Sequence, residues 1–427
     1  MKPYSRSIFD LFDSKRRYEV PLFQRQYVWK REDHWEPLWE DVERKFVQQL
    51  NDSPPTPHVL GAMVLDQRRV YGNAVPVQLI IDGQQRMTTF QIFLSAFRDV
   101  CTAQGQQEYA EECARYLRNT GIMEDERVER YKLWPTNLDR KQFSDVIDSA
   151  SKEELSRRHP VVRRKYQRNP DPRPKMIECY FYFYDQLTDF IKSDEYKQPL
   201  RERVALMHEA LRGALQVVTV ELEGDDDPQV IFETLNARGQ PLLPSDLLRN
   251  FIFLRASQQR ESPEELYTEF WLPFDDDFWR ALEKQGRLQR PRSDIFLQHY
   301  LTLQRKQEVL ISRLYSEYKD WIKGANPFPT VKAELENLSK HRTYFEDLVQ
   351  PDLNTSIGRF SGFLRIFDLS TVYPLLLGMM GAETGNDELA GMLEDLESYI
   401  FRRAVCALGT NNYNRFFLTV LSKLGRS

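Results

Sequence analysis

The first part of the chain alternates short apolar runs with helical periodicity, which indicates a mixed α/β unit. The predicted elements are a strand over 18–22, a loop over 23–30, a helix over 31–50 and strands over 59–67 and 78–81. The last of these strands leads into Asp82 and Gly83, and a helical period follows over 85–100. This strand–turn–helix is the most informative local feature of the sequence, because a helix N-terminus presents unpaired amides.

Helical periodicity dominates from residue 108 onward. The elements expected there are a loop over 157–175, a helix over 176–191, a β-rich run over 215–222, a short helix over 228–236 and a further helix from Pro244. Ser245 or Asp246 is well placed to cap the amides of that last helix. After Phe251 the pattern predicts only helices.

Length and pattern together predict the architecture. At 427 residues the chain exceeds the size of one core, so that more than one domain is expected. The fold class is α+β, with a small mixed α/β N-terminal domain followed by a mainly α-helical domain. We place the first domain at residues 1–255, with a helical insertion around 105–210, and the second at 256–427.

The composition indicates a globular protein without an overall basic character. Apolar residues make up 41% of the chain and the formal net charge is −5, so that any DNA contact needs a local basic patch. The scattered cysteines lack metal-type spacing and are typical of free thiols in a reducing compartment. No apolar stretch approaches the ~20 residues of a membrane span, and the N-terminus lacks a signal-peptide pattern. We therefore expect a cytoplasmic protein without a membrane partner.

The segment that begins at Asp82 combines the residue types of a phosphate-binding corner. Gly83 permits a positive φ or a close backbone approach, and the helix N-terminus after it is a ready anion site. Arg86 offers a planar fork for phosphate oxygens, while Asp82 is suited to hold Mg²⁺ or to orient a water. The other side chains expected to reach a nucleotide are Gln84, Gln85, Thr88 and Thr89. A capped turn in which Asp82 and Arg86 only fix the corner explains the same spacing.

The loop between the first strand and the first helix is a second candidate. Rings stack on bases and arginine binds phosphate, so the residues expected to line a ligand site are Gln24, Arg25 and Tyr27. The neighbouring apolar residues are interpreted as a hydrophobic plug: Phe23, Val28 and Trp29.

A third segment, residues 231–250, places polar side chains beside apolar helix faces. Its polar members are Asn236, Arg238, Asp246 and Arg249. This grouping suggests a shared cleft that Asn236 and Arg238 close over a nucleotide, whereas a helix C-cap is the alternative explanation of Gly239.

The stretch 157–175 is the best electrostatic footprint for DNA on an otherwise acidic chain. It holds eight Lys or Arg residues against one acid. The candidate DNA-binding residues are Arg157, Arg158, Arg163, Arg164, Lys165 and Arg168. A solvated charged surface is the alternative interpretation.

Several catalytic motifs are missing from the sequence. The absence of a G-x-x-x-x-G-K-[ST] stretch excludes a Walker-type NTPase, and neither H-E-x-x-H nor G-x-S-x-G occurs. The six histidines are isolated and build no convincing metal or nuclease site.

Three blocks, in this order, resemble the ParB-like N-terminal domain of GmrSD-type modification-dependent restriction proteins, a group that includes sensors of phosphorothioated or glucosylated DNA. The blocks are Val20-Pro21 with 23–29, Ile81-Asp82-Gly83-Gln84-Gln85-Arg86 with Thr88-Thr89, and 232–236 with Arg238-Gly239 and 246–248. The resemblance covers the first 255 residues firmly, and the helical remainder resembles the family's helical extension more loosely.

The resemblance implies a nucleoside-triphosphatase, such as a GTPase, that uses Mg²⁺ and acts as the sensor of an antiviral restriction system. Relatives read modified double-stranded DNA with this part, and nucleotide turnover controls a nuclease, expected here on another subunit or on a longer form of the chain. The expected catalytic residues are Asp82, which is also the metal ligand, Gln84, Gln85 and Arg86. Self-association stays open. The alternatives are a non-enzymatic reader of modified DNA and a ParB-like nuclease.

Overall fold

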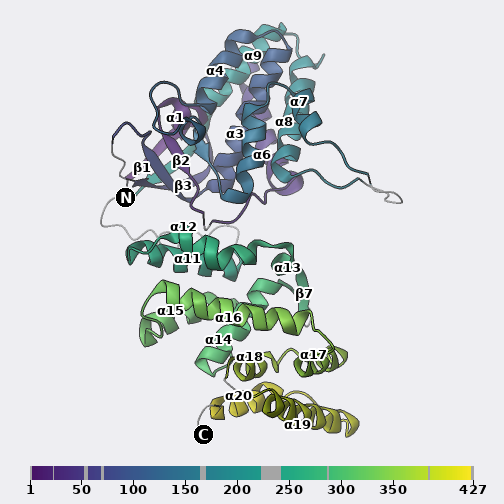
Figure 1. Cartoon of the computed structure of the whole chain (residues 1–427). Coiled ribbons are helices and arrows are strands. Elements are labelled where there is room, and N and C mark those ends of the chain that lie inside the picture. The colour runs from purple at the N-terminus through teal and green to yellow at the C-terminus, as the bar shows by residue number, and fades with distance from the viewer. Residues whose placement is uncertain are drawn as a thin grey trace. The chain divides into compact units, whose positions relative to one another are not determined.

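The computed structural model describes residues 2–22, 24–51, 56–68, 72–163, 170–222, 242–285, 288–382 and 385–424. The chain forms two compact units, unit 1 (Met1–Gly239) and unit 2 (Gln240–Ser427). Figure 1 shows the elements of each unit. The α+β class predicted from the sequence is confirmed, because the sheet lies in unit 1 and unit 2 is mainly helical. The domain boundary placed at residue 255 stays a prediction.

One mixed sheet, with six strands in the described residues, organises unit 1. Its strands are β1 (Lys2–Ser7), β2 (Arg17–Glu19), β3 (His58–Arg68), β4 (Val77–Asp82), β5 (Leu133–Trp134) and β6 (Leu215–Glu221). Their order is β1-β6-β3-β4-β2-β5, and β3 runs antiparallel to β4 but parallel to β6. The apolar runs predict four of these strands. They do not predict β1, which is exposed along most of its length, or β5, which has only two residues.

The helices of unit 1 pack around α3 (Gln84–Ala103), which is buried along most of its length against α4, α6 and α8. The other helices are α1 (Ile8–Asp13), α2 (Glu36–Leu50), α4 (Gln107–Leu117), α5 (Glu126–Glu129), α6 (Asn137–Asp148), α7 (Lys152–Arg158), α8 (Lys175–Lys192) and α9 (Leu200–Glu209). A π-helical turn, Arg31–Trp35, precedes α2, and a second one, Ala210–Ala214, follows α9. The helices predicted over 31–50, 85–100 and 176–191 are confirmed.

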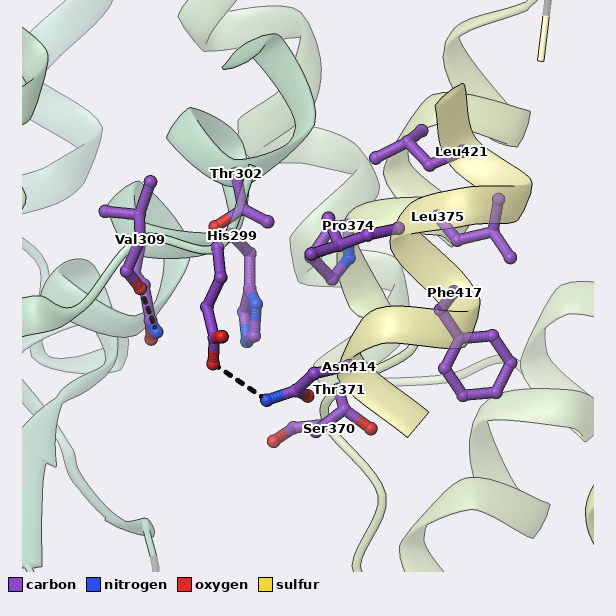
Figure 2. A pocket seen from close by; sticks show the side chains of 13 residues that line it. His299, Thr302, Val309, Ser370, Thr371, Pro374, Leu375, Asn414, Phe417 and Leu421 are labelled. Carbon is purple, nitrogen blue, oxygen red and sulfur yellow. Dashed lines mark hydrogen bonds between the residues drawn. The ribbon is translucent and has the colours of Figure 1, made fainter. Parts of the chain in front are cut away.

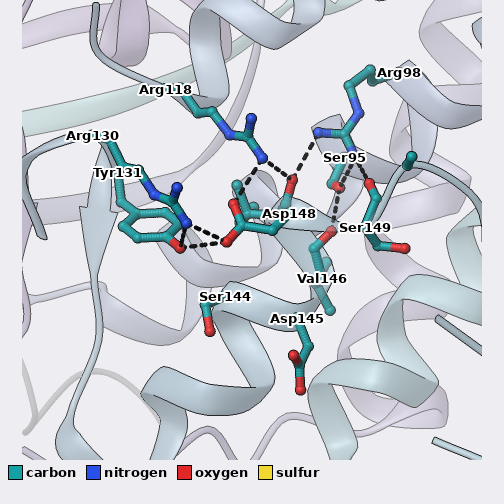
Figure 3. Close-up of polar contacts among 12 residues, drawn as sticks. Ser95, Arg98, Arg118, Arg130, Tyr131, Ser144, Asp145, Val146, Asp148 and Ser149 are labelled. Atoms are coloured by element: carbon teal, nitrogen blue, oxygen red, sulfur yellow. Dashed lines mark hydrogen bonds and ion pairs between the residues drawn. The ribbon is translucent and has the colours of Figure 1, made fainter. Parts of the chain in front are cut away.

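Polar contacts fix α3 against the C-terminal end of α6 (Figure 3). Arg98 donates to the carbonyls of Ile147 (2.9 Å) and Ser149 (2.7 Å), and Ser95 Oγ donates to the Val146 carbonyl (3.0 Å). The last carbonyls of a helix have no partner within the helix, so these bonds satisfy groups that would otherwise be orphaned in the interior. The position of α3, and therefore of its N-terminus, is set by the core.

The described part of unit 2 is a stack of helices with one short hairpin. Its α-helices are α11 (Pro244–Gln258), α12 (Pro263–Leu266), α13 (Asp277–Arg280), α14 (Arg292–Arg305), α15 (Leu314–Ala325), α16 (Val331–Val349), α17 (Ser356–Ile366), α18 (Tyr373–Gly381), α19 (Asn386–Val405) and α20 (Tyr413–Lys423). In this stack α16 packs on α11, α17 and α18, and α18 packs on α14 and α20. No described helix is both long enough and apolar enough to cross a membrane.

Two local predictions for unit 2 are wrong. The hairpin of β7 (Leu282–Gln285) and β8 (Leu288–Pro291) interrupts the helices expected after Phe251. Its leucines are exposed, so the sequence lacks the alternation of buried and exposed residues that would have predicted strands. The cap of α11 also differs. The helix begins at Pro244, so Ser245 lies inside the first turn, and its amide donates to Asp294 Oδ1 of α14 at 2.9 Å. A side chain from a distant helix therefore replaces the local cap.

Candidate functional site

The junction between β4 and α3 requires a glycine. Gly83 has a φ of +94°, in the left-handed region that residues with a Cβ rarely adopt. A Cβ at this position would lie 2.7 Å from Cγ of Met63 on the neighbouring strand β3. Because the chain turns here without a side chain in the way, α3 begins directly where β4 ends.

In the described part of the chain, the N-terminus of α3 lacks side-chain groups that would neutralise its unpaired amides. No side chain caps it, and its first turn contains no acidic residue. The first intrahelical bond runs from the Met87 amide to the Gly83 carbonyl at 2.9 Å, so the amides of residues 84–86 precede the helical ladder. The helix is 20 residues long, and its dipole places positive partial charge at this end. The junction is therefore electrostatically suited to an anion.

Asp82 and Arg86 flank this junction and are both half-buried. Burial raises the pKa of Asp82, although the Gly83 amide, Arg86 and Arg25 act in the opposite direction. Burial lowers the pKa of Arg86, and Asp82 opposes that shift. A guanidinium keeps its charge in proteins, so the corner presents one carboxylate and two arginines.

The backbone of β3 holds the Arg86 guanidinium in place. Arg86 Nη1 donates to the Ala62 carbonyl at 2.6 Å. The preceding Gly61 has a φ of +119°, and a Cβ there would lie 2.7 Å from Arg86 Nη2. The pairing of β3 with β6 shifts register between Val59 and Ala62, which marks a bulge. Motif spacing does not identify Gly61, although a single glycine inside a strand-like run is a signal for such a close approach.

Gln84 and Gln85 attach the loop after β2 to the start of α3. Gln84 Nε2 donates to the Arg25 carbonyl at 3.2 Å, and Gln85 Nε2 donates to the Gln26 carbonyl at 2.9 Å. Gln85 Oε1 also accepts the Val28 amide at 2.8 Å. Both side-chain amides therefore hydrogen bond to the backbone of the loop. This attachment brings Arg25 close enough to Asp82 to lower the pKa of its carboxyl group. Their predicted catalytic role stays a prediction, and the observed contacts position the loop.

The other residues predicted to face a nucleotide lie inside this junction. Gln24 is buried, and its Nε2 donates to the Ile81 carbonyl of β4 at 3.3 Å. The Tyr27 hydroxyl lies 2.7 Å from Thr89 Oγ1 and accepts from Trp35 Nε1 at 2.9 Å. Thr88 and Thr89 are also buried. In this structure these side chains support the corner from within, and ligand contact by them stays a prediction.

Only part of the predicted DNA-binding stretch can be placed. Arg157 and Arg158 end α7, and Arg163 follows on an exposed segment, whereas Arg164, Lys165 and Arg168 lie outside the described residues. Arg158 pairs with Glu154 and Asp145. Arg157 and Arg163 are therefore the better placed of the described candidates for a phosphate contact.

The third predicted segment is divided. Asn236 and Arg238 lie outside the described residues. Arg249 belongs to unit 2, where it pairs with Asp246 at 2.7 Å and with Asp275 at 3.1 Å. These described contacts are internal to unit 2, and the shared cleft stays a prediction.

The described residues contain no cluster of three or more His, Cys, Asp or Glu side chains that would hold a metal ion. The single carboxylate of Asp82 nevertheless suits Mg²⁺, because this ion commonly keeps several waters and takes one or two protein carboxylates together with substrate phosphates. The donor set at the corner therefore fits a metal that arrives with a nucleotide.

Fold and corner together define an α+β protein in which a strand–helix junction brings together backbone amides, arginines and one carboxylate. The family profile described as the N-terminal domain of the GmrSD restriction endonuclease matches residues 8–253. The chain belongs to this family, and it is a component of a restriction system, a class of system that acts in antiviral defence. Membership implies DNA as the target and a nuclease as a partner. A search of curated proteins finds no match to this chain.

Proposed function

We propose that this chain is the sensor of its restriction system, and that it binds and hydrolyses a nucleoside triphosphate. The observation that carries the proposal is the junction after β4. There, an uncapped helix N-terminus, the left-handed Gly83 and the half-buried Arg86 meet beside Asp82. Strand–glycine–helix junctions of this type present amides and dipole to phosphate.

Each residue of the junction has a defined task in this proposal. The amides of residues 84–86 bind phosphate oxygens, and Arg86 neutralises their charge while the Ala62 carbonyl keeps its guanidinium oriented. Asp82 would hold Mg²⁺, which supplies Lewis-acid stabilisation of the phosphates when it is bound. The loop carried by Gln84 and Gln85 forms the adjoining wall and places Arg25 next to Asp82.

The proposal assigns DNA reading to the same chain. Arg157 and Arg163 contact backbone phosphates of modified double-stranded DNA, together with the other basic residues of the stretch. Nucleotide turnover then controls the partner nuclease. Since each neutralised phosphate contributes to the salt dependence of binding, replacement of Arg157 and Arg163 by Glu reduces both the affinity and the slope of log K against log salt.

The decisive experiment measures phosphate release from ATP, GTP, CTP and UTP with Mg²⁺, with and without modified DNA. Wild type is compared with Arg86→Ala and Arg86→Lys, and Arg127→Ala is the matched control because its side chain is 92% exposed. We expect Arg86→Ala to lose turnover by about 100-fold, the effect of removing one preorganised donor, while Arg127→Ala retains it.

Three outcomes contradict the proposal. A folded wild-type protein that hydrolyses none of the four nucleotides would make the junction a scaffold. So would turnover that survives in a folded Arg86→Ala variant. If Arg86→Ala does not fold, Arg86→Lys decides, because lysine keeps a charged donor but loses the planar fork; wild-type turnover in that variant would contradict a phosphate-specific role.

A further inference from the structure

A cavity of about 270 Å³ lies in unit 1, at the opposite end of β4 from the β4–α3 junction. Its polar lining consists of Arg6, Lys15, Arg16, Gln67, Gln78 and Glu221. Four strands supply these side chains together with the segment after α1, and α1 packs on β1 and β6, which brings that segment to the sheet (Figure 1). Gln78 and Asp82 lie about 13 Å apart along β4, so the cavity is separate from the proposed nucleotide site.

This cavity differs in charge from the cavity around His299 in unit 2. Residues of α14, α18 and α20 line the cavity in unit 2, and Glu308 is the one Asp, Glu, Lys or Arg among the described residues of its lining (Figure 2). The cavity in unit 1 instead has three cationic side chains and one acidic side chain. Its lining is therefore suited to an anion.

The two arginines of the lining have different partners. Arg6 Nη2 donates to Glu221 Oε1 at 2.6 Å, and this ion pair is neutral as a whole. Arg16 donates to neutral oxygens, from Nε to Ser14 Oγ at 2.6 Å and from Nη1 to Gln78 Oε1 at 3.3 Å. Gln78 is 5% exposed, so Arg16 is anchored on a side chain of the core. Arg16 therefore contributes an oriented positive charge.

Lys15 adds a second positive charge. Its Nζ donates to the Ile122 carbonyl, and within the described residues neither Lys15 nor Arg16 forms an ion pair with a carboxylate. Both side chains have accessible surface, since Lys15 is exposed and Arg16 is half-buried. The described lining thus has an excess of two positive charges, and like charges gathered in one recess raise the local concentration of anions.

The neighbouring Lys132 shows the effect of this charge. Its Nζ donates to the carbonyl of Ser14, the residue before Lys15, at 2.8 Å. Burial lowers the pKa of Lys132 to about 8, and Arg16 acts in the same direction while Asp13 opposes it. The positive potential of the cavity therefore extends to a cation beside it.

Charge and donor types select a phosphate monoester as the ligand. Such an ester carries a charge of about −1.5 to −2 at neutral pH, which matches the excess of two positive charges, whereas a carboxylate or a phosphodiester carries only one. A guanidinium presents a planar fork to phosphate oxygens. Gln67 is exposed, and its Nε2 makes only long contacts of 3.4 Å with the carbonyls of Arg68 and Val77. It is therefore able to turn and donate to a further phosphate oxygen.

We propose that this cavity binds the terminal phosphate of a nucleotide monoester, with Lys15 and Arg16 as the charged contacts and Gln67 as a neutral donor. A cavity of about 150 Å³ accepts benzene, so 270 Å³ accommodates the phosphate and part of its sugar. A protein of a restriction family meets such esters as free mononucleotides or as phosphorylated ends of DNA strands, and both present the same group. The inference does not rest on the proposed nucleotide site, with which the cavity shares no residue.

Calorimetry of the full chain tests the inference with thymidine monophosphate, with thymidine, and with a short oligonucleotide that ends either in a phosphate or in a hydroxyl. Lys15→Gln and Arg16→Gln each remove one charge, and Gln67→Glu places a carboxylate at an exposed position of the lining. Arg313→Gln is the matched control, because it removes an exposed arginine from unit 2. We expect each cavity variant to weaken binding of the monophosphate about tenfold, equivalent to about 1.4 kcal/mol, and Arg313→Gln to leave it unchanged.

The pH dependence of binding is a second readout, which a merely structural role of Lys15 or Arg16 would not produce. The second proton of a phosphate monoester dissociates at about pH 6. Thymidine monophosphate should therefore bind more tightly above that pH than below it.

Binding of the monophosphate identifies a free ester, and binding of the phosphorylated oligonucleotide alone, still weakened by Arg16→Gln, identifies a strand end. The inference is overturned if folded wild type binds neither, as it would if acidic residues of the chain itself compensated Lys15 and Arg16. It is also overturned if the folded cavity variants bind as wild type does, or if the hydroxyl forms bind as tightly as the phosphorylated forms. Arg86→Ala separates the two sites, because loss of ester binding in that folded variant would place the ester at the β4–α3 junction instead.

Discussion

At the residue scale, two glycines determine whether the β4–α3 junction can exist. Gly83 occupies a left-handed conformation above Met63, and Gly61 occupies another beneath the Arg86 guanidinium. Both positions combine an unfavourable φ for a larger residue with a lack of space. The two effects can be measured separately at Gly105. This residue has a φ of +70°, but a Cβ added there would meet no atom within 4 Å beyond its chain neighbours.

The first prediction compares Gly83→Ala with Gly105→Ala. Gly105→Ala is expected to lose about 1–2 kcal/mol of unfolding free energy, the cost of a left-handed backbone for a residue with a Cβ. Gly83→Ala is expected to lose about 1–3 kcal/mol more, because the methyl group overpacks against Met63. Urea denaturation of both variants measures the difference. Equal losses would show that the space around Gly83 is not restrictive.

The second prediction concerns Asp82, whose pKa burial raises above the ordinary value. Because the pKa of Asp82 is higher in the folded than in the unfolded protein, the unfolding free energy falls as the pH rises through the folded-state pKa. Below the unfolded-state pKa of about 3.9 this loss of stability is absent. Asp82→Asn should therefore be more stable than wild type at neutral pH, with an advantage that disappears in acid.

Denaturation of both proteins between pH 3 and pH 8 tests the sign. Phosphate release at pH 7 should fall in the same variant, since the proposed metal ligand is lost. A variant that is less stable at neutral pH would show that the contacts of Asp82 with Gly83 and Arg86 outweigh its burial.

At the element scale, the central relation is the attachment of the loop after β2 to α3. The bonds of Gln85 to Gln26 and Val28 cross from one element to another, and the Asp139 carboxylate of α6 accepts the Tyr27 amide at 2.9 Å. The loop is thus held by side chains of helices, including Lys175 of α8, which donates to the Val28 carbonyl, rather than by a ladder of backbone bonds.

The third prediction is that Gln85→Ala releases this loop without unfolding α3. Loss of the two hydrogen bonds of the buried Gln85 side chain to the half-buried Gln26 and Val28 should cost about 1–3 kcal/mol. Amide exchange at Val28 should accelerate while exchange in the middle of α3 stays slow. Hydrogen exchange by mass spectrometry measures both regions. Gln107→Ala is the control, because Gln107 is an exposed glutamine on α4; a similar effect there would remove the special role of Gln85.

Element boundaries illustrate what periodicity can and cannot predict. The buried strand β4 and the helix α3 follow directly from apolar runs, because each run is long enough to show its period. The start of α11 is partly predicted, since Pro244 marks it, but the partner of the Ser245 amide is Asp294, which lies 49 residues away. No local pattern identifies a partner at that separation.

At the scale of the whole molecule, each unit has buried residues of its own. Leu94 lies in the core of unit 1 and Leu338 in that of unit 2, and both are fully buried. A compact unit with its own core unfolds cooperatively. A chain with two such units is therefore expected to show two unfolding transitions.

The fourth prediction is that calorimetry resolves two unfolding transitions. Leu94→Ala should lower the midpoint temperature of only one transition, and Leu338→Ala that of only the other. Each substitution is expected to remove about 2–5 kcal/mol of unfolding free energy from its own unit. A nucleoside triphosphate with Mg²⁺ should raise the transition that Leu94→Ala lowers. A single transition displaced by both substitutions would mean that the units unfold as one.

The sequence by itself determined the fold class, the order of the main elements and the corner from Asp82 to Arg86. These depend on local properties, namely the period of apolar residues, a glycine after a strand and a charged residue within one turn. The resemblance of three short blocks was enough to identify the family, which the profile over residues 8–253 confirms.

Only the tertiary structure decided what each side chain of the corner contacts. Gln84, Gln85 and Tyr27 have residue types that suit a ligand, yet their partners are loop backbone and core atoms from other elements. Gly61 is essential to the position of Arg86 because of a bulge in another strand. The cavity around His299 arises from helices far apart in the chain. Burial and hydrogen-bond partners depend on which distant segments meet, and that information is absent from any local pattern.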